Sequence, residues 1–379
     1  MLRVDKLRLL IGLLFVGCAV DPSFGENIGG GKAAGKDGVP EETKQIVAQE
    51  SSSSKEDRLL EQFRVLEKSV SILSSEVKEL RQQLNRFQVR APVTVYKLPD
   101  VVSICGEKIP LEDKKVWEVL DQEFLSALGS EIQVLLWMKR ARRYFPYIER
   151  KLKEMNLPDD LKYLAVAESS LRPHAVSSAK AAGVWQFIPS TGEKYGMRGN
   201  RDIDERFDVL KATEGALTYL KTLYEEFRNW PLAMAAYNTG ETRIRKEVAL
   251  QRTCDYFHLD LPLETERYVY RIAVAKIILS DPKKYGFSLD EDQFYDALHL
   301  ERVQIELPVP LPIIDVASAT GVYYKDIKEM NLHLTGEVIP SGVQALNLPH
   351  GSSETFWTFF KEWKRTCLPK KNNDRKQGK

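Results

Sequence analysis

A glutamate interrupts an apolar stripe near the middle of the chain. Pro158 and Asp159 are typical of a helix start, and Pro173 disfavours helical geometry in the residue before it, so we expect a helix between them. The apolar positions of this helix are Leu161, Leu164, Ala165 and Leu171. Glu168 falls at the same helical spacing, so it occupies a position where a core residue is expected.

Such a position gives a carboxyl group a particular chemistry. Burial disfavours the charged form and raises the pKa of a glutamate toward the range in which it can donate a proton near neutral pH. Glu168 is therefore a candidate general acid. The alternative is that Glu168 lies at a frayed helix end and simply reaches solvent.

The segment after Glu168 suits the binding of sugars. Residues 179–183 are rich in Ala and Gly and permit close approach of the backbone, and Trp185 and Gln186 then add an aromatic surface and an amide. Sugar rings stack on aromatic side chains, and their hydroxyl and N-acetyl groups bond to amides. The alternative for Trp185 is a plain core residue.

More polar groups stand at the end of another expected helix. Asn229 and Pro231 are typical of a helix start, and Gly240 fits a helix end. Tyr237 and Asn238 lie in the last turn, where their polar tips could reach a cleft. By contrast, we expect the acidic residues 202–208 to be solvated charge at the N-terminus of a helix that begins at Val209.

Composition excludes several classes of protein. The 379 residues contain 55 Lys and Arg against 54 Asp and Glu, a net charge of +1, which argues against a nucleic-acid partner. Four cysteines are too few for a disulfide framework, and neither CxxC nor HExxH spacing occurs. We therefore expect no metal and no cofactor.

The first 18 residues predict a signal peptide. Basic residues precede an apolar run over residues 9–16, which is too short to span a bilayer. Cys18 follows Gly17 as in a bacterial lipobox, in which the cysteine is lipidated. The alternative is cleavage after residues 23–25, Ser-Phe-Gly. We expect export to the cell envelope, with the chain in the periplasm and anchored to the outer membrane as a lipoprotein.

Two different segments follow the signal. Residues 19–54 are rich in Gly, Ser, Lys and Glu and predict a flexible tether. Residues 55–90 predict a coiled coil, because apolar residues alternate at spacings of four and three, a strict 3.5-residue period that favours a homodimer or trimer. This seam consists of Leu59, Phe63, Leu66, Val70, Leu73, Val77, Leu80, Leu84 and Phe87. The alternative is a single amphipathic helix docked on its own domain.

The remainder predicts a mainly α chain. Prolines mark residues 91–110 as a linker, and helical periodicity over residues 111–290 predicts a compact all-α domain. Residues 300–366 predict a strand, two short helices and a closing strand, which form a small α+β module. The charged residues 367–379 predict a disordered tail.

Four ordered motifs resemble the lytic transglycosylases of the goose-type lysozyme superfamily, the soluble lytic transglycosylase family. Glu168 and Ser169 match its Glu-Ser motif, and residues 183–186, Gly-Val-Trp-Gln, match its Gly-Leu-Met-Gln motif. Residues 236–240, Ala-Tyr-Asn-Thr-Gly, match Ala-Tyr-Asn-x-Gly, and residues 264–269 resemble a Glu-Thr-x-x-Tyr-Val segment. The resemblance implies a lysozyme-like all-α fold for the catalytic domain.

The resemblance also implies cleavage of the β-1,4 bond between N-acetylmuramic acid and N-acetylglucosamine in peptidoglycan, with a 1,6-anhydro product. Glu168 would serve as the single general acid and base, because the sugar's own C6 hydroxyl is the nucleophile. Most glycosidases instead use two carboxylates, and no second acid is placed like Glu168. The residues implied to bind or orient the substrate are Ser169, Trp185, Gln186, Tyr237, Asn238 and Tyr268.

In that family the C-terminal module would be LysM-like, a fold that binds peptidoglycan, although the usual Gly-Asp-Thr-Leu opening is replaced by Pro-Leu-Pro-Ile at residues 310–313. The expected partners are glycan strands, the membrane through a lipid anchor, and further copies of the chain through the coiled coil at residues 59–87. Two other functions remain open: a muramidase that uses water, and a non-catalytic, peptidoglycan-binding coiled-coil scaffold of the envelope.

Overall fold

The computed structural model describes residues 41–86 and 92–367 of the chain. It divides the chain into two compact units between Val89 and Arg90. The expected signal peptide, Cys18 and the expected tail beyond Cys367 lie outside the described residues. Within the described ranges, no helix is both long enough and apolar enough to cross a membrane.

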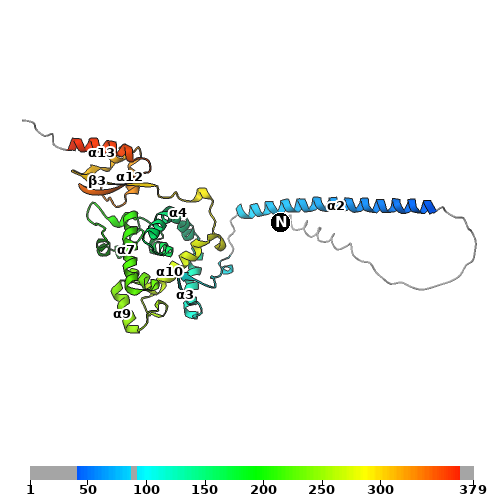
Figure 1. Cartoon of the computed structure of the whole chain (residues 1–379), viewed down its shortest axis with the longest axis horizontal. Helices are drawn as coiled ribbons and strands as arrows, with labels where there is room; N and C mark the ends of the chain where they lie inside the picture. Colours follow the sequence, from blue (N-terminus) through cyan, green and yellow to red (C-terminus); the bar gives the residue numbers. More distant parts are fainter. Residues whose placement is uncertain (1–40, 87–91, 368–379) are drawn as a thin grey trace, which may run out of the picture. The chain divides into compact units, whose positions relative to one another are not determined.

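The described part of the first unit is one continuous helix, α2 (Glu41–Arg86), drawn in blue in Figure 1. The seam residues from Leu59 to Leu80 lie on it and are all exposed. The helix begins earlier than we expected, so residues 41–54 are helical and not part of a flexible tether. Glu, Lys, Gln and Ala dominate residues 41–50, and these residues favour a helix without needing burial.

The second unit begins with a mainly helical part. Its α-helices are α3 (Lys114–Gly129), α4 (Glu131–Glu154), α5 (Lys162–Ser169), α6 (Pro189–Lys194), α7 (Val209–Phe227), α8 (Trp230–Thr239), α9 (Glu241–Gln251) and α10 (Leu263–Ser280). Short 3-10 turns join them at η1 (Val93–Val95), η2 (Asp159–Leu161), η3 (Glu205–Phe207), η4 (Tyr256–His258), η5 (Pro282–Tyr285) and η6 (Glu291–Gln293). Helix α8 is capped by Asn229 and ends at Gly240, as the sequence predicts.

The expected linker at residues 91–110 is instead part of the fold. Strands β1 (Ser103–Ile104) and β2 (Glu107–Lys108) form a hairpin that pairs Ser103 with Lys108. Its turn places Cys105 at φ 52° and Gly106 at φ 85°, which suits a tight two-residue connection. Ile104 and the neighbouring Ile109 are fully buried in the core. The prolines that flank this segment suggested a linker, and each strand of the hairpin is too short to show an alternating strand pattern in the sequence.

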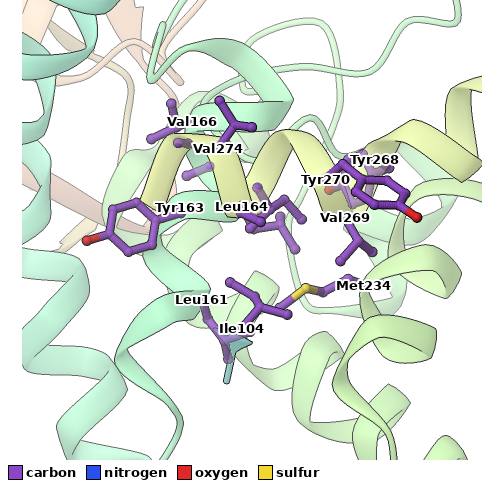
Figure 2. Packing of buried hydrophobic residues seen from close by; sticks show 14 of the residues in the cluster. Ile104, Leu161, Tyr163, Leu164, Val166, Met234, Tyr268, Val269, Tyr270 and Val274 are labelled. Atoms are coloured by element: carbon purple, nitrogen blue, oxygen red, sulfur yellow. The ribbon is translucent and has the colours of Figure 1, made fainter. Parts of the chain in front are cut away.

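Helix α10 lies at the centre of this core, where it packs against α3, α5 and α8. Figure 2 shows Val269 and Val274 of α10 beside Leu164 of α5 and Met234 of α8. Alanines 233, 235 and 236 of α8 are completely buried, so this helix can approach its neighbours closely. The core therefore fixes α3, α5 and α8 against α10.

The C-terminal module follows the expected order of strand, two helices and strand. Strand β3 (Leu300–Leu307) pairs antiparallel with β6 (Gly342–Pro349), while β4 (Leu311–Pro312) pairs with β5 (Val338–Ile339). Helices α11 (Ile313–Thr320) and α12 (Tyr324–Met330) lie between them in sequence. A further helix that the sequence analysis missed, α13 (Ser353–Cys367), buries Phe356 and Phe360 against the module.

The acidic segment 202–208 fastens this module to the helical part. Asp208 caps α7, as expected for N-terminal charge, but its side chain is buried and accepts two hydrogen bonds from Arg302 of β3, at 2.7 and 3.0 Å. Glu205 is also buried, between Arg198 and Lys211. The expectation of solvated charge was therefore wrong for these two residues. The partner of Asp208 belongs to the other part of the fold, and the turn at residues 205–207 brings Arg198 and Lys211 together around Glu205.

Replacement of Arg302 should destabilise the second unit. Burial raises the pKa of Asp208, but hydrogen bonds and attraction from Arg302 outweigh it, so the net pKa lies below its usual value. Arg302→Met leaves Asp208 buried without this partner and should lower the free energy of unfolding by about 3 kcal/mol in urea titrations at pH 7. Because a lowered pKa stabilises the fold above the usual aspartate pKa, of about 3.9, the variant should also lose less stability as the pH falls through that range.

The control for this change is Arg201→Met, which alters an exposed arginine of the same segment. That variant should stay within about 0.5 kcal/mol of the parent chain. Equal stability of the two variants would contradict a structural role for the Asp208 and Arg302 pair.

Candidate active site

Glu168 lies in the last turn of α5 and is half-buried. The hydroxyl of Tyr268, which projects from the first half of α10, donates a hydrogen bond to Glu168 Oε1. Tyr268 is almost completely buried. Because α5 and α10 pack directly against each other, the core keeps the carboxyl group of Glu168 within hydrogen-bond distance of the Tyr268 hydroxyl.

The surroundings of Glu168 raise its pKa to about 7. Burial is the largest cause, because it disfavours the carboxylate, and the negative charge of Glu264 adds to the effect. The hydrogen bond from Tyr268 acts in the opposite direction by stabilising the carboxylate. Near neutral pH the group can therefore both give and take a proton.

Glu264 is a second carboxylate whose charge reaches Glu168, although its side chain is exposed on the first turn of α10. In the sequence, Glu264 stands out only as the first residue of the segment at residues 264–269. Its proximity could not be recognised, because the two residues belong to separate helices.

Ser169 directs its hydroxyl away from Glu168. The hydroxyl donates to the carbonyl oxygen of Val184 at 2.8 Å and accepts from the backbone N–H of Arg172 at 3.1 Å. Ser170 and Leu171 then adopt left-handed conformations, with φ of 56° and 57°. Ser169 therefore joins the sharp end of α5 to the segment that contains residues 183–187.

Trp185 is a core residue in this structure. Its side chain is fully buried, and its Nε1–H donates to Thr213 Oγ1 at 2.9 Å. The expectation that Trp185 offers an aromatic face to a sugar is therefore replaced by the alternative that we considered. Residue spacing alone could not distinguish the two, because both place an aromatic ring beside the same loop.

Gln186 follows Trp185 in a tightly folded turn. Its Nε2 donates to the carbonyl oxygens of Gly183 and Ala175, at 2.8 and 3.2 Å. Gly183 has φ of 78°, and a Cβ there would lie 2.1 Å from the carbonyl oxygen of Arg206, so no other residue fits. The amide of Gln186 thus helps to shape this turn, and the bonds that it makes here use only its N–H groups.

Tyr237 and Asn238 extend the site from the end of α8. The hydroxyl of Tyr237 donates to the carbonyl oxygen of Trp185 at 2.8 Å, and burial and the charge of Glu168 raise the pKa of Tyr237 well above its usual value. Asn238 Oδ1 accepts from Thr265 Oγ1 at 2.9 Å, which leaves the Nδ2 donors of Asn238 for a ligand. The structure therefore brings Tyr237 near Glu168 and Tyr268.

Three charged residues outside the motifs brace these helices. Glu107 of the hairpin accepts from Asn229 Nδ2 and from the backbone N–H of Trp230, at the start of α8. Asp160, just before α5, accepts from the backbone N–H of Cys105 at 2.7 Å and from Lys276 Nζ of α10 at 2.8 Å. The hairpin is thus bonded to the start of α8, to the turn before α5 and, through the carbonyl oxygen of Ser103, to Lys276 of α10. Sequence reasoning missed it, because the partners are far apart in sequence.

Removal of the Tyr268 hydroxyl should raise the pKa of Glu168 above about 7, because the hydroxyl stabilises the carboxylate. The measurement is a pH titration of ¹³C-labelled glutamate carboxyls in Tyr268→Phe, with the Glu168 signal assigned by its loss in Glu168→Gln. Tyr237→Phe is the matched control, since its hydroxyl bonds to a backbone carbonyl. An unchanged or lower pKa in Tyr268→Phe would contradict this account of the pair.

Comparisons with known proteins agree with this geometry. Residues 145–259 match the family described as the transglycosylase SLT domain. Membrane-bound lytic murein transglycosylase D of Escherichia coli is 36% identical over 216 residues, which cover 55% of this chain and 47% of that protein. A putative tributyltin chloride resistance protein of Alteromonas is 32% identical over 124 residues, or 32% of this chain and 60% of that protein.

Among solved structures, an inactive mutant of the lytic transglycosylase Slt of Pseudomonas aeruginosa is 19% identical to this chain. The aligned residues cover 37% of this chain and 23% of that one, with a TM-score of 0.25. The chain spans about half the length of transglycosylase D. Residues 145–259 are therefore similar to the transglycosylase SLT domain family.

Proposed function

We propose that this chain is a peptidoglycan lytic transglycosylase that cleaves the β-1,4 bond between N-acetylmuramic acid and N-acetylglucosamine. The observation that carries the proposal is the half-buried Glu168, whose pKa is raised to about 7 beside the hydroxyl of Tyr268. The SLT domain family and the similarity to lytic murein transglycosylase D support the same substrate.

In the proposed reaction, Glu168 first donates its proton to the glycosidic oxygen as the bond from that oxygen to C1 of the muramic acid breaks. The C6 hydroxyl of the same sugar then forms a bond to C1, and its proton returns to the Glu168 carboxylate. The product is a 1,6-anhydro sugar, and no water is consumed. A pKa near neutrality suits both steps, because the same group acts first as acid and then as base.

Other residues around Glu168 would position the acid or bind the substrate. Tyr268 would hold the carboxyl group in place, Tyr237 would lie near the scissile bond, and Asn238 would bind sugar through its Nδ2 donors. We propose that Gln186 and Ser169 act through the turn that they stabilise, and that their remaining acceptor sites meet the substrate's polar groups.

One observation favours a hydrolytic alternative, the muramidase. The exposed carboxylate of Glu264 is close enough for its charge to act on Glu168, and a carboxylate in that place could activate a water. The two reactions differ in their products, because hydrolysis leaves a reducing sugar that is heavier by one water.

Mass spectrometry of a peptidoglycan digest distinguishes the candidates. We expect 1,6-anhydro products from the parent chain, and a loss of about 10²- to 10⁴-fold in rate for Glu168→Gln, which cannot donate a proton. Glu225→Gln, which changes an exposed glutamate of α7, is the control and should keep the parent rate. Hydrated products would establish the muramidase, and no release at all would favour the non-catalytic scaffold.

We also propose that α2 associates with further copies of the chain through its seam. The seam residues from Leu59 to Leu80 are between 49% and 63% exposed in a single chain, so association would remove a long apolar strip from water. A pair of adjacent residues allows a matched test, since Leu73 of the seam and Ile72 outside it are both 52% exposed.

Leu73→Asp should shift the chain from an oligomer toward the 43.3 kDa monomer, because it places a charge in the seam. Ile72→Asp adds the same charge outside the seam and should leave the oligomer intact. Light scattering coupled to gel filtration measures both masses. A parent chain that elutes as a monomer would refute the association, and equal effects of the two changes would exclude the seam as its interface.

We further propose that the chain acts in the cell envelope. Residues 1–18 would direct export, and lipidation of Cys18 would anchor the chain to the outer membrane, with the enzyme in the periplasm. The similarity to proteins described as membrane-bound supports this placement. The C-terminal module would be LysM-like and would bind glycan, a role that its strand, helix, helix, strand order supports.

A further inference from the structure

Two adjoining hollows lie beside the end of α5, and their lining residues come from α3, α4, α5, α10 and the segment that follows α5. The larger, of about 740 Å³, is lined by residues of α4, among them Arg140, and by Ser170 and Arg172 after α5. The smaller, of about 230 Å³, is lined by parts of α3, α4 and α10, including Arg267 and Arg271. Both include Ser170, which is two residues after Glu168 in sequence, so the hollows adjoin the chain segment that follows the proposed catalytic acid.

Two guanidinium groups of the larger hollow are anchored to the backbone at Ser169 and Ser170. Arg140 Nη1 donates to the carbonyl oxygen of Ser170 at 3.1 Å, and Arg172 Nε donates to the carbonyl oxygen of Ser169 at 3.0 Å. A guanidinium has five N–H donors, so each side chain is held by one bond and keeps others for a ligand. The two residues thereby form a preorganised pair of donors.

The charge of this pair is not neutralised by the protein. Within the described ranges, neither Arg140 nor Arg172 lies within ion-pair distance of a carboxylate, whereas Arg267 and Arg271 share the buried Glu123. Burial lowers the pKa of Arg140, and the positive charge of Arg172 lowers it further. The one carboxylate that lines the larger hollow is Glu131, which is exposed on the first turn of α4. The hollow therefore favours an anion, although the whole chain is close to neutral.

The proposed substrate carries such anions. In intact peptidoglycan, the lactyl group of N-acetylmuramic acid is joined by an amide bond to a stem peptide that has free carboxylates. A planar guanidinium binds a carboxylate through two parallel hydrogen bonds, and a hollow of about 740 Å³ has room for several amino-acid residues.

We propose that Arg140 and Arg172 bind a carboxylate of the stem peptide, so that the enzyme selects glycan strands that still carry their peptides. This inference rests on the proposed function and deepens it by naming a determinant of substrate choice. Since the same guanidiniums bond to the carbonyl groups of Ser169 and Ser170, the peptide would bind against the chain segment that follows the acid. The contact would strengthen substrate binding and would not take part in proton transfer.

The main test changes the substrate and leaves the protein intact. Soluble glycan strands with stem peptides are compared before and after their carboxylates are converted to neutral amides with carbodiimide and ammonia. We expect the KM of the full chain to rise about tenfold on amidation, with kcat little changed, because a charge-assisted contact is lost. An equal KM for the two substrates would overturn the inference.

Variants then locate the effect. In the double variant Arg140→Gln and Arg172→Gln, the KM for native strands should rise to that of the amidated strands, and amidation should have no further effect. The double lysine variant keeps both charges and should retain part of the preference. Arg150→Gln changes an exposed arginine farther along α4 and should behave as the parent chain. An undiminished response to amidation in the double glutamine variant would also overturn the inference.

A third substrate distinguishes the source of the carboxylate. Strands stripped by an amidase lack stem peptides but expose the lactyl carboxylate of the sugar itself. We expect these strands to bind as weakly as amidated ones. If they bind as tightly as native strands, and through the same arginines, the stem-peptide assignment is wrong. If native strands yield anhydro products with no preference, only the inference fails, whereas the absence of any cleavage would refute the proposed function, and the inference with it.

Discussion

The site depends on one buried contact, that between Glu168 and Tyr268 where α5 crosses α10. A carboxyl group at the surface would be ionised at neutral pH and could not donate a proton. Burial raises the pKa of Glu168, while the single hydrogen bond from Tyr268 limits that rise, and the balance lies at about 7. The packing of α10 against α5 and α8 maintains this pKa, because a small shift between the helices would change both the burial of Glu168 and its hydrogen bond with Tyr268.

The helices are in turn held by groups outside the motifs. The hairpin at residues 103–108 reaches α8 through Glu107, and it reaches α5 and α10 through Asp160 and Lys276. Each bond is partly buried and charge-assisted, so each is stronger and more directional than a surface ion pair. Residues 145–259, which match the family, therefore do not contain all of the residues that position the proposed acid.

The sequence predicted the parts of the site that depend on local pattern. Glu168 was recognised because it broke a helical stripe, and the bounds of α8 followed from Asn229, Pro231 and Gly240. Features that depend on distant partners could not be predicted in this way. Asp208 looked like solvated charge until Arg302 was placed beside it, and Trp185 could have faced either the core or a sugar. The hairpin strands, of two residues each, are too short to show a periodicity.

The length of helix α2 has a mechanical consequence. A flexible segment of 46 residues would have ends at a wide range of separations, most of them short. An α-helix rises 1.5 Å per residue, so α2 is about 70 Å long and resists both compression and extension. Under the proposed anchoring, these 46 residues would therefore contribute a nearly constant length, whereas a flexible segment would contribute a variable one.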